Sequence, residues 1–341
     1  MSTHRIAIIG AGLAGLAAAR RLVDAGHAVQ LFEKSGAPGG RAATRRRGAG
    51  SFDHGAQYAT FRDPRGRAVL EAARAAGVLA PWSARIGVRS VDGTRACPPD
   101  TERFVGVPDM RAVGEWMADG LDVRYETLVT ALTPDPARGS GRDWSLTLDG
   151  GATAHGFDCV LLTVPAPQAR TLLATAAEAG VRVDALAAVV DAVPMTPCFA
   201  ALLTVPRRPE WPWDAAFVHD DAVLAWVARN ASKPHRGDAE CWVLHATTAW
   251  SLAHLEVTPD ALVPHFASAW ARLLPDAVAP TSIAVHRWRY ARPADGMFSG
   301  DEAHLDATLG LGVAGDWCVG GRIEGALLSG RTLADRVLAM R

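Results

Sequence analysis

Residues 6–33 read IAIIGAGLAGLAAARRLVDAGHAVQLFE, and this stretch is the most informative about the fold. Ile6–Ile9 is a short β-branched run, typical of a parallel strand buried on both faces. Leu13–Ala25 has the apolar and alanine-rich spacing of a helix, which ends near Gly26. Ala28–Phe32 then indicates a second strand, so the chain is predicted to open with a β-α-β unit.

The turn between the first strand and the helix carries the pattern G-x-G-x-x-G. Its glycines allow a tight turn, close backbone approach to a pyrophosphate and close packing of helix on strand. The helix directs its amide-rich N-terminus at that pyrophosphate. Glu33 ends the second strand, about 20 residues further on, where a carboxylate accepts hydrogen bonds from a ribose. The residues expected at this dinucleotide site are Gly10, Gly12, Leu13, Ala14, Gly15 and Glu33.

A secretory signal peptide is the competing explanation of the same residues. His4 and Arg5 precede an apolar run from Ile6 to Ala19 that has small residues near its end. The three glycines interrupt that run, and the dinucleotide motif accounts for their order. No other segment has the uninterrupted apolar length needed to span a bilayer, so we expect no membrane partner.

The overall composition limits the classes of partner. The chain has 341 residues, more than one ordinary domain, and 49% of them are hydrophobic. Its 35 basic residues are balanced by 36 acidic ones, which leaves no broad field to attract nucleic acid or an anionic membrane. The five cysteines show no C-x-x-C spacing, so we expect neither a disulfide framework nor a metal site. A reducing cytoplasm is the expected compartment.

Two further glycine motifs lie far apart in the sequence. Gly39-Gly40-Arg41 follows Glu33, and there a glycine pair lets amides face a phosphate while the arginine supplies a fork of donors. The arginines at positions 45–47 read as a solvated basic loop and are not assigned to the site. Near the C-terminus, Gly315-Asp316 follows a predicted strand and precedes a helix that carries Glu324-Gly325-Ala326.

Together these motifs resemble the FAD domain of the glutathione-reductase type, in its amine-oxidase branch. The resemblance implies noncovalent FAD, with the Gly-Asp pair contacting the ribityl chain and pyrophosphate. A helix N-terminus would face the flavin ring, where its dipole stabilises the reduced form. It also implies that Cys318 packs rather than bonds to the flavin. The further cofactor-binding residues that it implies are Lys34, Gly40, Arg41, His54, Gly55, Ala56, Val129, Thr163, Pro165, Gly315, Asp316, Arg322, Glu324, Gly325 and Ala326.

The fold class follows from this resemblance and from a change in composition along the chain. Residues from about 168 to 300 hold most of the tryptophans and alternating runs typical of an antiparallel sheet. We therefore predict a two-domain α/β flavoprotein: a Rossmann-type FAD domain with a parallel sheet and a β-meander, and an inserted α+β substrate domain with an antiparallel sheet. The FAD domain is expected over residues 1–82, 108–166 and 305–341, and the substrate domain over residues 83–107 and 167–304.

Closer motifs resemble one branch, renalase and its bacterial relatives, over essentially the whole chain. They are Asp53-His54-Gly55-Ala56-Gln57-Tyr58, Asn230-Ala231-Ser232-Lys233-Pro234, residues 245–251, Trp288-Arg289-Tyr290-Ala291 and residues 315–326. The resemblance implies oxidation of dihydronicotinamide dinucleotides, the 2- or 6-dihydro isomers of NAD(P)H. Hydride would pass to flavin N5, giving NAD(P)+, and O2 would then reoxidise the flavin and release hydrogen peroxide.

Hydride transfer needs no protein nucleophile, only two oriented rings in a dry pocket. No H-E-x-x-H, G-x-S-x-G or P-loop motif competes for the assignment. The residues expected around the substrate are Gln57, Tyr58, His245, Trp288, Arg289 and Tyr290. Each also has an ordinary explanation, such as a buried tyrosine in the core, a satisfied core histidine or a surface ion pair.

Three alternatives stay open at this point. A true amine oxidase or desaturase-type enzyme shares the fold and commonly places a lysine near flavin N5. Lys34 and Lys233 are the only lysines, and Lys34 belongs beside the ribose, so Lys233 is the only candidate. A non-catalytic flavin- or nucleotide-binding protein is the second alternative. An NAD-dependent dehydrogenase is the third, and a simple NAD fold does not require Gly39-Gly40-Arg41.

Overall fold

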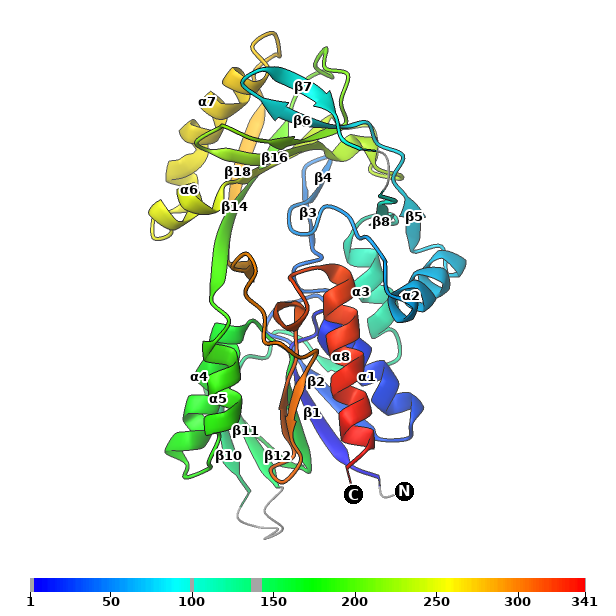
Figure 1. Cartoon of the computed structure of the whole chain (residues 1–341), viewed down its shortest axis with the longest axis vertical. Helices are drawn as coiled ribbons and strands as arrows, with labels where there is room; N and C mark the ends of the chain where they lie inside the picture. Colours follow the sequence, from blue (N-terminus) through cyan, green and yellow to red (C-terminus); the bar gives the residue numbers. More distant parts are fainter. Residues whose placement is uncertain (1–2, 99–100, 136–142, 341) are drawn as a thin grey trace.

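The computed structural model describes residues 3–98, 101–135 and 143–340, and these form two lobes with the two chain ends together in one of them (Figure 1). A six-stranded sheet has the order β19-β20-β13-β1-β2-β9, and every pair in it is parallel except β19 with β20. Its strands are β1 (Arg5–Ile9), β2 (Ala28–Phe32), β9 (Asp122–Arg124), β13 (Cys159–Leu162), β19 (His304–Asp306) and β20 (Leu311–Val313).

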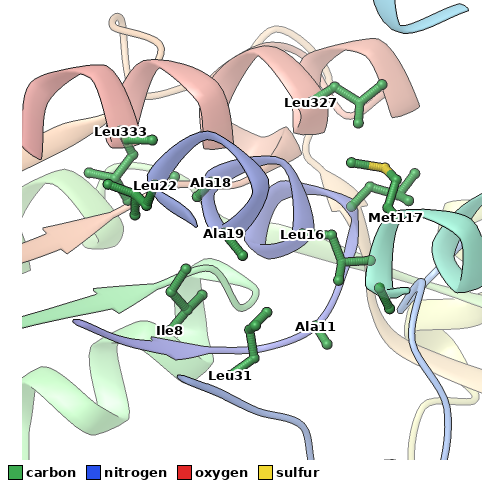
Figure 2. Close-up of a cluster of buried hydrophobic side chains, with 14 of the residues drawn as sticks. Ile8, Ala11, Leu16, Ala18, Ala19, Leu22, Leu31, Met117, Leu327 and Leu333 are labelled. Carbon is green, nitrogen blue, oxygen red and sulfur yellow. The ribbon is translucent and has the colours of Figure 1, made fainter. Parts of the chain in front are cut away.

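Strand β1 is buried on both faces, as its β-branched run predicts. Ile6 and Ile8 belong to one hydrophobic cluster, and Ala7 and Ile9 belong to the other, because successive side chains of a strand point to opposite faces. Helices cover the first face: α1 (Leu13–Asp24), α3 (Arg111–Ala118) and α8 (Ile323–Leu338). Figure 2 shows α1 lying between Ile8 on the sheet side and Leu333 on the α8 side.

The other face of this sheet is covered by the expected β-meander and by a helix pair. The meander consists of β10 (Val129–Pro134), β11 (Trp144–Leu148) and β12 (Thr153–Phe157), with the short helix η1 (Asp149–Gly151) between the last two strands. The helices α4 (Ala166–Glu178) and α5 (Asp184–Asp191) pack in the same hydrophobic cluster as β10 and β13.

The second lobe is built on a seven-stranded sheet of order β18-β14-β17-β16-β15-β6-β7, antiparallel except where β6 pairs with β15. Its strands are β6 (Ile86–Ser90), β7 (Gly93–Ala96), β14 (Met195–Thr204), β15 (Ala215–Val218), β16 (Leu224–Arg229), β17 (Cys241–Ala246) and β18 (Ser282–Pro293). Three helical segments cover its outer face: α6 (Thr248–Ala253), η3 (Pro259–Leu262) and α7 (Val263–Leu273).

Smaller elements complete the described chain. They are the hairpin β3 (Thr44–Arg47) and β4 (Gly50–Asp53), the pair β5 (Leu79–Pro81) and β8 (Phe104–Gly106), α2 (Pro64–Ala75), η2 (Asn230–Ser232) and η4 (Asp316–Cys318). The arginines at positions 45–47, interpreted from sequence as a loop, therefore lie on a short strand. Among the described residues, none of the helices combines the length and apolar character that crossing a membrane requires.

The predicted fold class is confirmed, with two differences in detail. The helices α4 and α5, placed in the substrate domain by the expected boundary at residue 167, instead bury their apolar faces against the FAD-domain meander. The sequence of Val123–Leu132 predicts one strand, whereas the structure divides this run between β9 and β10, which belong to different sheets. Both differences arise because a short apolar run does not specify which neighbouring element it packs against.

Prediction for the packing of α8 on α1. A Cβ atom at Gly330 would overlap the carbonyl group of Ala14, so the two helices meet here backbone to backbone. In most helix interiors Gly→Ala stabilises by about 1 kcal/mol. Here we expect Gly330→Ala to destabilise by about 1–3 kcal/mol, because the helices must separate. Thermal unfolding measures the change, and Arg331→Ala at the exposed next position is the control. An unchanged or higher melting temperature for Gly330→Ala contradicts the prediction.

Candidate functional site

A cavity of about 1670 Å³ lies between the lobes and is lined by both of them. It is larger than the roughly 300–1,000 Å³ of a typical small-molecule pocket. One end is formed by the β1–α1 turn, the end of β2 and the N-terminus of α8. The other end is formed by the inner faces of β16, β17 and β18.

Some glycines of the G-x-G-x-x-G motif line the cavity, and another packs helix α1 on the sheet. Gly10 adopts a φ of 103°, which favours glycine, and Gly12 is the N-cap of α1. A Cβ atom on Gly12 would meet nothing within 4 Å, so this position faces open space. Gly15 is different, because its Cβ would overlap the carbonyl oxygen of Gly10 and approach Thr163 Oγ1 to 2.6 Å. Gly15 therefore packs α1 on the sheet and lies outside the cavity lining.

Glu33 lies at the end of β2, buried to 7% exposure, and lines the cavity. Its carboxylate accepts hydrogen bonds from the backbone N–H groups of Ala11 and Ser35, both at 2.8 Å, and from Ser35 Oγ at 2.7 Å. A carboxylate offers about four lone-pair positions, so acceptor capacity is left for the hydroxyls of a ribose. Lys34 and Gly40 follow along the same wall.

Arg41 makes contacts that a phosphate fork does not require. Its guanidinium binds the Asp316 carboxylate in bidentate form, Nη2 to Oδ1 at 2.6 Å and Nη1 to Oδ2 at 3.1 Å. Nη1 also donates to the carbonyl oxygen of Ala291 at 3.0 Å, near the end of β18. Because bidentate charged pairs hold geometry well, Arg41 joins the N-terminal glycine loop, the Gly315-Asp316 turn and the inserted lobe at one point.

The start of α8 is only partly directed at the cavity. Arg322 and Ala326 line it, while Glu324 and Gly325 do not. The Glu324 carboxylate turns away and accepts the backbone N–H groups of Arg62 and Asp63, at 2.6 and 2.8 Å, in the loop before α2. Thus Glu324, expected at the cofactor, instead accepts hydrogen bonds from two backbone donors of the loop before α2.

The remaining residues expected at the cofactor line the cavity: Leu13, Ala14, His54, Gly55, Ala56, Val129, Thr163, Pro165 and Gly315. Thr163 also shapes the glycine turn, because its hydroxyl donates to the carbonyl oxygens of Ile9 and Gly10 at 3.0 and 2.9 Å. Only the tertiary fold brings Val129 of the meander next to these two chain-terminal segments.

The inserted lobe presents a row of aromatic and imidazole side chains. Strand register sets Ala200 beside His245 on one side and His286 on the other, while Trp226 is paired with His245. Residues at paired register positions share a face of the sheet, so these three rings line the same wall.

His54 of the FAD lobe meets this row. Its ring stacks on Trp288 at 5.0 Å and meets His286 edge-on at 4.7 Å. Its carbonyl oxygen accepts from Trp288 Nε1 at 3.0 Å and lies 3.1 Å from His245 Nε2. We call His54, His245, His286 and Trp288 the ring wall.

The three histidines of the ring wall are neutral at ordinary pH. Burial, then the neighbouring His286 and Arg45, lower the pKa of His54 to about 3. Burial, with a smaller effect of the Lys233 charge, lowers the pKa of His245 to about 4. Burial and Arg45 lower the pKa of His286 to about 4. The wall is therefore an uncharged surface of stacked and edge-on rings at pH 7.

The structure separates the six residues expected around the substrate. His245, Trp288, Arg289 and Tyr290 line the cavity, and Arg289 at its rim forms an exposed pair with Glu256 at 2.8 Å. Gln57 and Tyr58 lie behind the wall. Gln57 donates to the carbonyl oxygen of Gly55 at 3.2 Å, and Tyr58 packs between Trp82 and Trp226.

His286 is a lining residue that the sequence interpretation missed. It stands two positions before Trp288, so the alternation of a strand places both on one face. The sequence contains this alternation. It does not contain the register that places His286 and His245 on either side of Ala200, because that register depends on the pairing of β14 with two strands. The other missed lining residues of this lobe include Pro197, Cys198, Phe217 and Trp226. Arg45 and Arg46, set aside from sequence as a solvated loop, also line the cavity, so leaving them out of the site was wrong.

Prediction for acid sensitivity. Because the three pKa values fall from 6.5 to between about 3 and 4 on folding, the unfolded chain binds protons that the folded protein does not. The free energy of unfolding is therefore highest above pH 6.5 and decreases as the pH falls towards about 4. We expect the melting temperature to drop across that window, and to drop less in His286→Gln. Exposed His219→Gln is the control, and an equal drop in parent and His286→Gln contradicts the prediction.

Comparison with known proteins agrees with this geometry. A sequence model described as an NAD(P)-binding Rossmann-like domain matches residues 8–73, and one described as a flavin-containing amine oxidoreductase matches residues 98–338. The fold resembles a structure named as a candidate protoporphyrinogen oxidase from Exiguobacterium sp. 255-15, with a TM-score of 0.77, 14% identity and 99% of each chain covered.

Two further solved structures share the fold. Putrescine oxidase bound to putrescine has a TM-score of 0.75 at 16% identity, over 99% of each chain. Cyclohexylamine oxidase from Brevibacterium oxydans IH-35A has a TM-score of 0.74 at 14% identity, over 98% of this chain and 99% of that one. The cavity suits FAD on its own evidence: an open glycine cradle at Gly12, a carboxylate at Glu33 and a volume of about 1670 Å³. The chain belongs to the family of flavin-containing amine oxidoreductases and uses FAD as its cofactor.

Proposed function

We propose that this flavoprotein oxidises dihydronicotinamide dinucleotides, the 2- and 6-dihydro isomers of NAD(P)H, as the renalase-like motifs imply. The observation that supports this substrate is the charge of the cavity wall. The inserted lobe contributes Arg287, Arg289 and Arg292 to the lining, and no carboxylate among the residues that the structure describes. Such a wall attracts the phosphates of a dinucleotide and repels a protonated amine.

The carboxylates near these arginines do not reverse that charge. Glu256 pairs with Arg289 and Asp295 pairs with Arg292, but both carboxylates are exposed and lie outside the lining. Exposed ion pairs of this kind are worth about 0–1 kcal/mol and exchange readily with other partners. The lining carboxylates Glu33 and Asp316 both belong to the FAD lobe, and both are already hydrogen-bonded there.

The ring wall suits the nicotinamide end of such a substrate. FAD, when bound, supplies the two-electron acceptor and its later reoxidation by O2. The chain's own contribution is a neutral aromatic surface, from His54, His286 and Trp288, against which an uncharged dihydropyridine ring can be oriented. Because these groups carry no charge at pH 7, the wall also tolerates the exclusion of water that hydride transfer needs.

Lys233, the one lysine left as a candidate to assist amine oxidation, is held in a buried ion pair. Its side chain is fully buried, with Nζ 3.0 Å from Asp53 Oδ2 and 3.4 Å from Gln57 Oε1. It is absent from the cavity lining, where Lys34 at the dinucleotide end is the lysine found among the described residues. This placement weakens the case for lysine-assisted amine oxidation.

Oxidation of an amine is the second candidate function. It is supported by the family description and by the fold shared with putrescine oxidase and cyclohexylamine oxidase. The aromatic lining, including Trp226, Trp288 and Tyr290, could also flank a small amine. A nicotinamide-only dehydrogenase is excluded, since the family carries flavin.

Prediction for substrate class. Holoprotein mixed anaerobically in a stopped-flow instrument should lose its flavin absorbance rapidly with 6-dihydroNAD. Ordinary 4-dihydroNADH should reduce it much more slowly, because the renalase resemblance implies the 2- and 6-dihydro isomers as substrates. Putrescine and cyclohexylamine should also be slow, because the arginines of the cavity wall repel their positive charge. Admission of O2 should then restore the flavin band and release peroxide.

The other outcomes of that experiment are equally informative. Rapid reduction by an amine alone would establish the second candidate in place of the first. If none of these compounds reduces the flavin absorbance, the non-catalytic flavin-binding alternative would be favoured. A protein that takes up no FAD would contradict the assignment of the cavity.

Prediction for cofactor retention. Glu33→Ala removes the carboxylate expected to hold the ribose and also releases the amides of Ala11 and Ser35. Hydrogen bonds to charged groups are worth about 1.5–3 kcal/mol, so we expect FAD affinity to fall by about tenfold or more. Flavin retained per chain after dialysis measures the effect. Exposed Glu71→Ala is the matched control, and equal retention by both variants removes the ribose assignment.

A further inference from the structure

The motif at residues 230–236 has no part in the function proposed so far, yet it is firmly bound to the other lobe. Asn230, with 0% exposure, donates to the carbonyl oxygen of Ser51 at 2.7 Å and accepts from the N–H of Asp53 at 3.3 Å. Ser232 Oγ accepts from Trp82 Nε1 at 3.1 Å. The segment therefore fixes the inserted lobe to strand β4, directly before the cavity residues His54–Ala56.

Within this contact lies a buried group of charges, Asp53, Lys233 and Arg236, which we call the seam cluster. Their exposures are 0%, 2% and 5%. Asp53 Oδ2 lies 3.0 Å from Lys233 Nζ and 2.7 Å from Arg236 Nη2. Two cations thus share one carboxylate, and with Lys233 protonated the seam cluster has a net charge of +1.

Hydrogen bonds complete the seam cluster without cancelling its charge. Asp53 Oδ1 accepts from Thr44 Oγ1 at 2.7 Å and from the N–H of Met110 at 3.1 Å. Arg236 also donates to the carbonyl oxygens of Pro108 and Pro234. Well-packed apolar residues often replace a buried ion pair without loss of stability. The surplus positive charge is therefore a feature that packing alone does not explain.

The seam cluster is connected to the cavity through a short chain of hydrogen bonds. Lys233 Nζ donates to Gln57 Oε1 at 3.4 Å, and Gln57 Nε2 donates to the carbonyl oxygen of Gly55 at 3.2 Å. The next amide, that of Ala56, donates to the carbonyl oxygen of Arg41 at 2.9 Å. Gly55, Ala56 and Arg41 all line the cavity. The Lys233 charge also contributes to lowering the pKa of His245, so it acts at the ring wall.

We propose that the net positive charge of the seam cluster acts through the cavity wall on the bound flavin and favours its reduced, more negatively charged form. Solvent and salt screen a buried charge only weakly, so its effect on a group across the cavity wall is larger than that of a surface charge. Lys233 and Arg236 do not line the cavity, so they are positioning residues rather than catalytic ones. The inference requires bound FAD and holds for either substrate class.

The test is the midpoint potential of the flavin in purified holoprotein, measured by dye-equilibrated reduction at about pH 7. Lys233→Met and Arg236→Met each remove one cation from the seam cluster. We expect each to disfavour flavin reduction about tenfold, a shift to lower potential of about 30 mV for a two-electron couple. Lys233→Arg restores the charge and should restore part of the potential.

Two control variants separate charge from structural damage. Asn230→Ala breaks the same contact between the lobes and leaves the seam cluster's charge intact. Arg229→Met removes a neighbouring cation that pairs with Glu240 at 2.7 Å, outside the seam cluster. We expect both to lower the melting temperature and to leave the potential unchanged.

The proposal is overturned if Lys233→Met and Arg236→Met keep the parent potential, or if Asn230→Ala shifts it as much as they do. Should one methionine variant fail to fold, the other supplies the measurement. A shift of potential that appears without any effect on dihydropyridine or amine turnover still supports the proposal, because the potential is read independently of activity.

Discussion

The close approach of α1 to its neighbours is the constraint on which the rest of the structure depends. On one side Gly15 lets α1 meet the turn after β1, and on the other Gly330 lets α8 meet α1 backbone to backbone. A side chain at either position would push the helices apart. With α1 held in place, the N-terminal glycine turn and the C-terminal Gly315-Asp316 turn lie at one end of one cavity. Arg41 then secures that arrangement through Asp316 and the end of β18.

Charge is distributed unequally around the cavity, and the burial of each ionisable side chain explains the distribution. At the ring wall, burial removes the proton from three histidines and leaves a neutral surface. In the seam cluster, burial lowers the pKa of Lys233 to about 8, but the Asp53 carboxylate opposes the shift and Lys233 keeps its charge at pH 7. At the rim, solvent keeps the arginines charged at little cost. A neutral surface thus stands between two positive regions, which suits a neutral ring carried on an anionic dinucleotide.

The cofactor and the substrate rest on different kinds of evidence. The family match spans most of the chain and agrees with a cavity that has the glycine cradle and the volume for a dinucleotide, so FAD is established for this chain. Structures with the same fold at 14–16% identity act on different substrates according to their names, so the fold does not select among them. The proposal of a dihydronicotinamide depends on the renalase-like motifs and on the charge of one wall, and direct reduction experiments test it.

The sequence by itself determined the local elements and the cofactor end of the site. Strand β1, helix α1 and the residues Gly12 and Glu33 are local signals, because hydrophobic periodicity and turn chemistry act over a few residues. Only the tertiary structure decided whether a predicted site residue points into the cavity or bonds to another part of the chain. Glu324 was expected at the flavin but satisfies the amides of Arg62 and Asp63, and Gln57 and Tyr58 lie behind the wall rather than on it. Likewise the register around β14 and the pairing of Lys233 with Asp53 join residues far apart in sequence. Such contacts are set by the burial of whole lobes against one another, which no local pattern encodes.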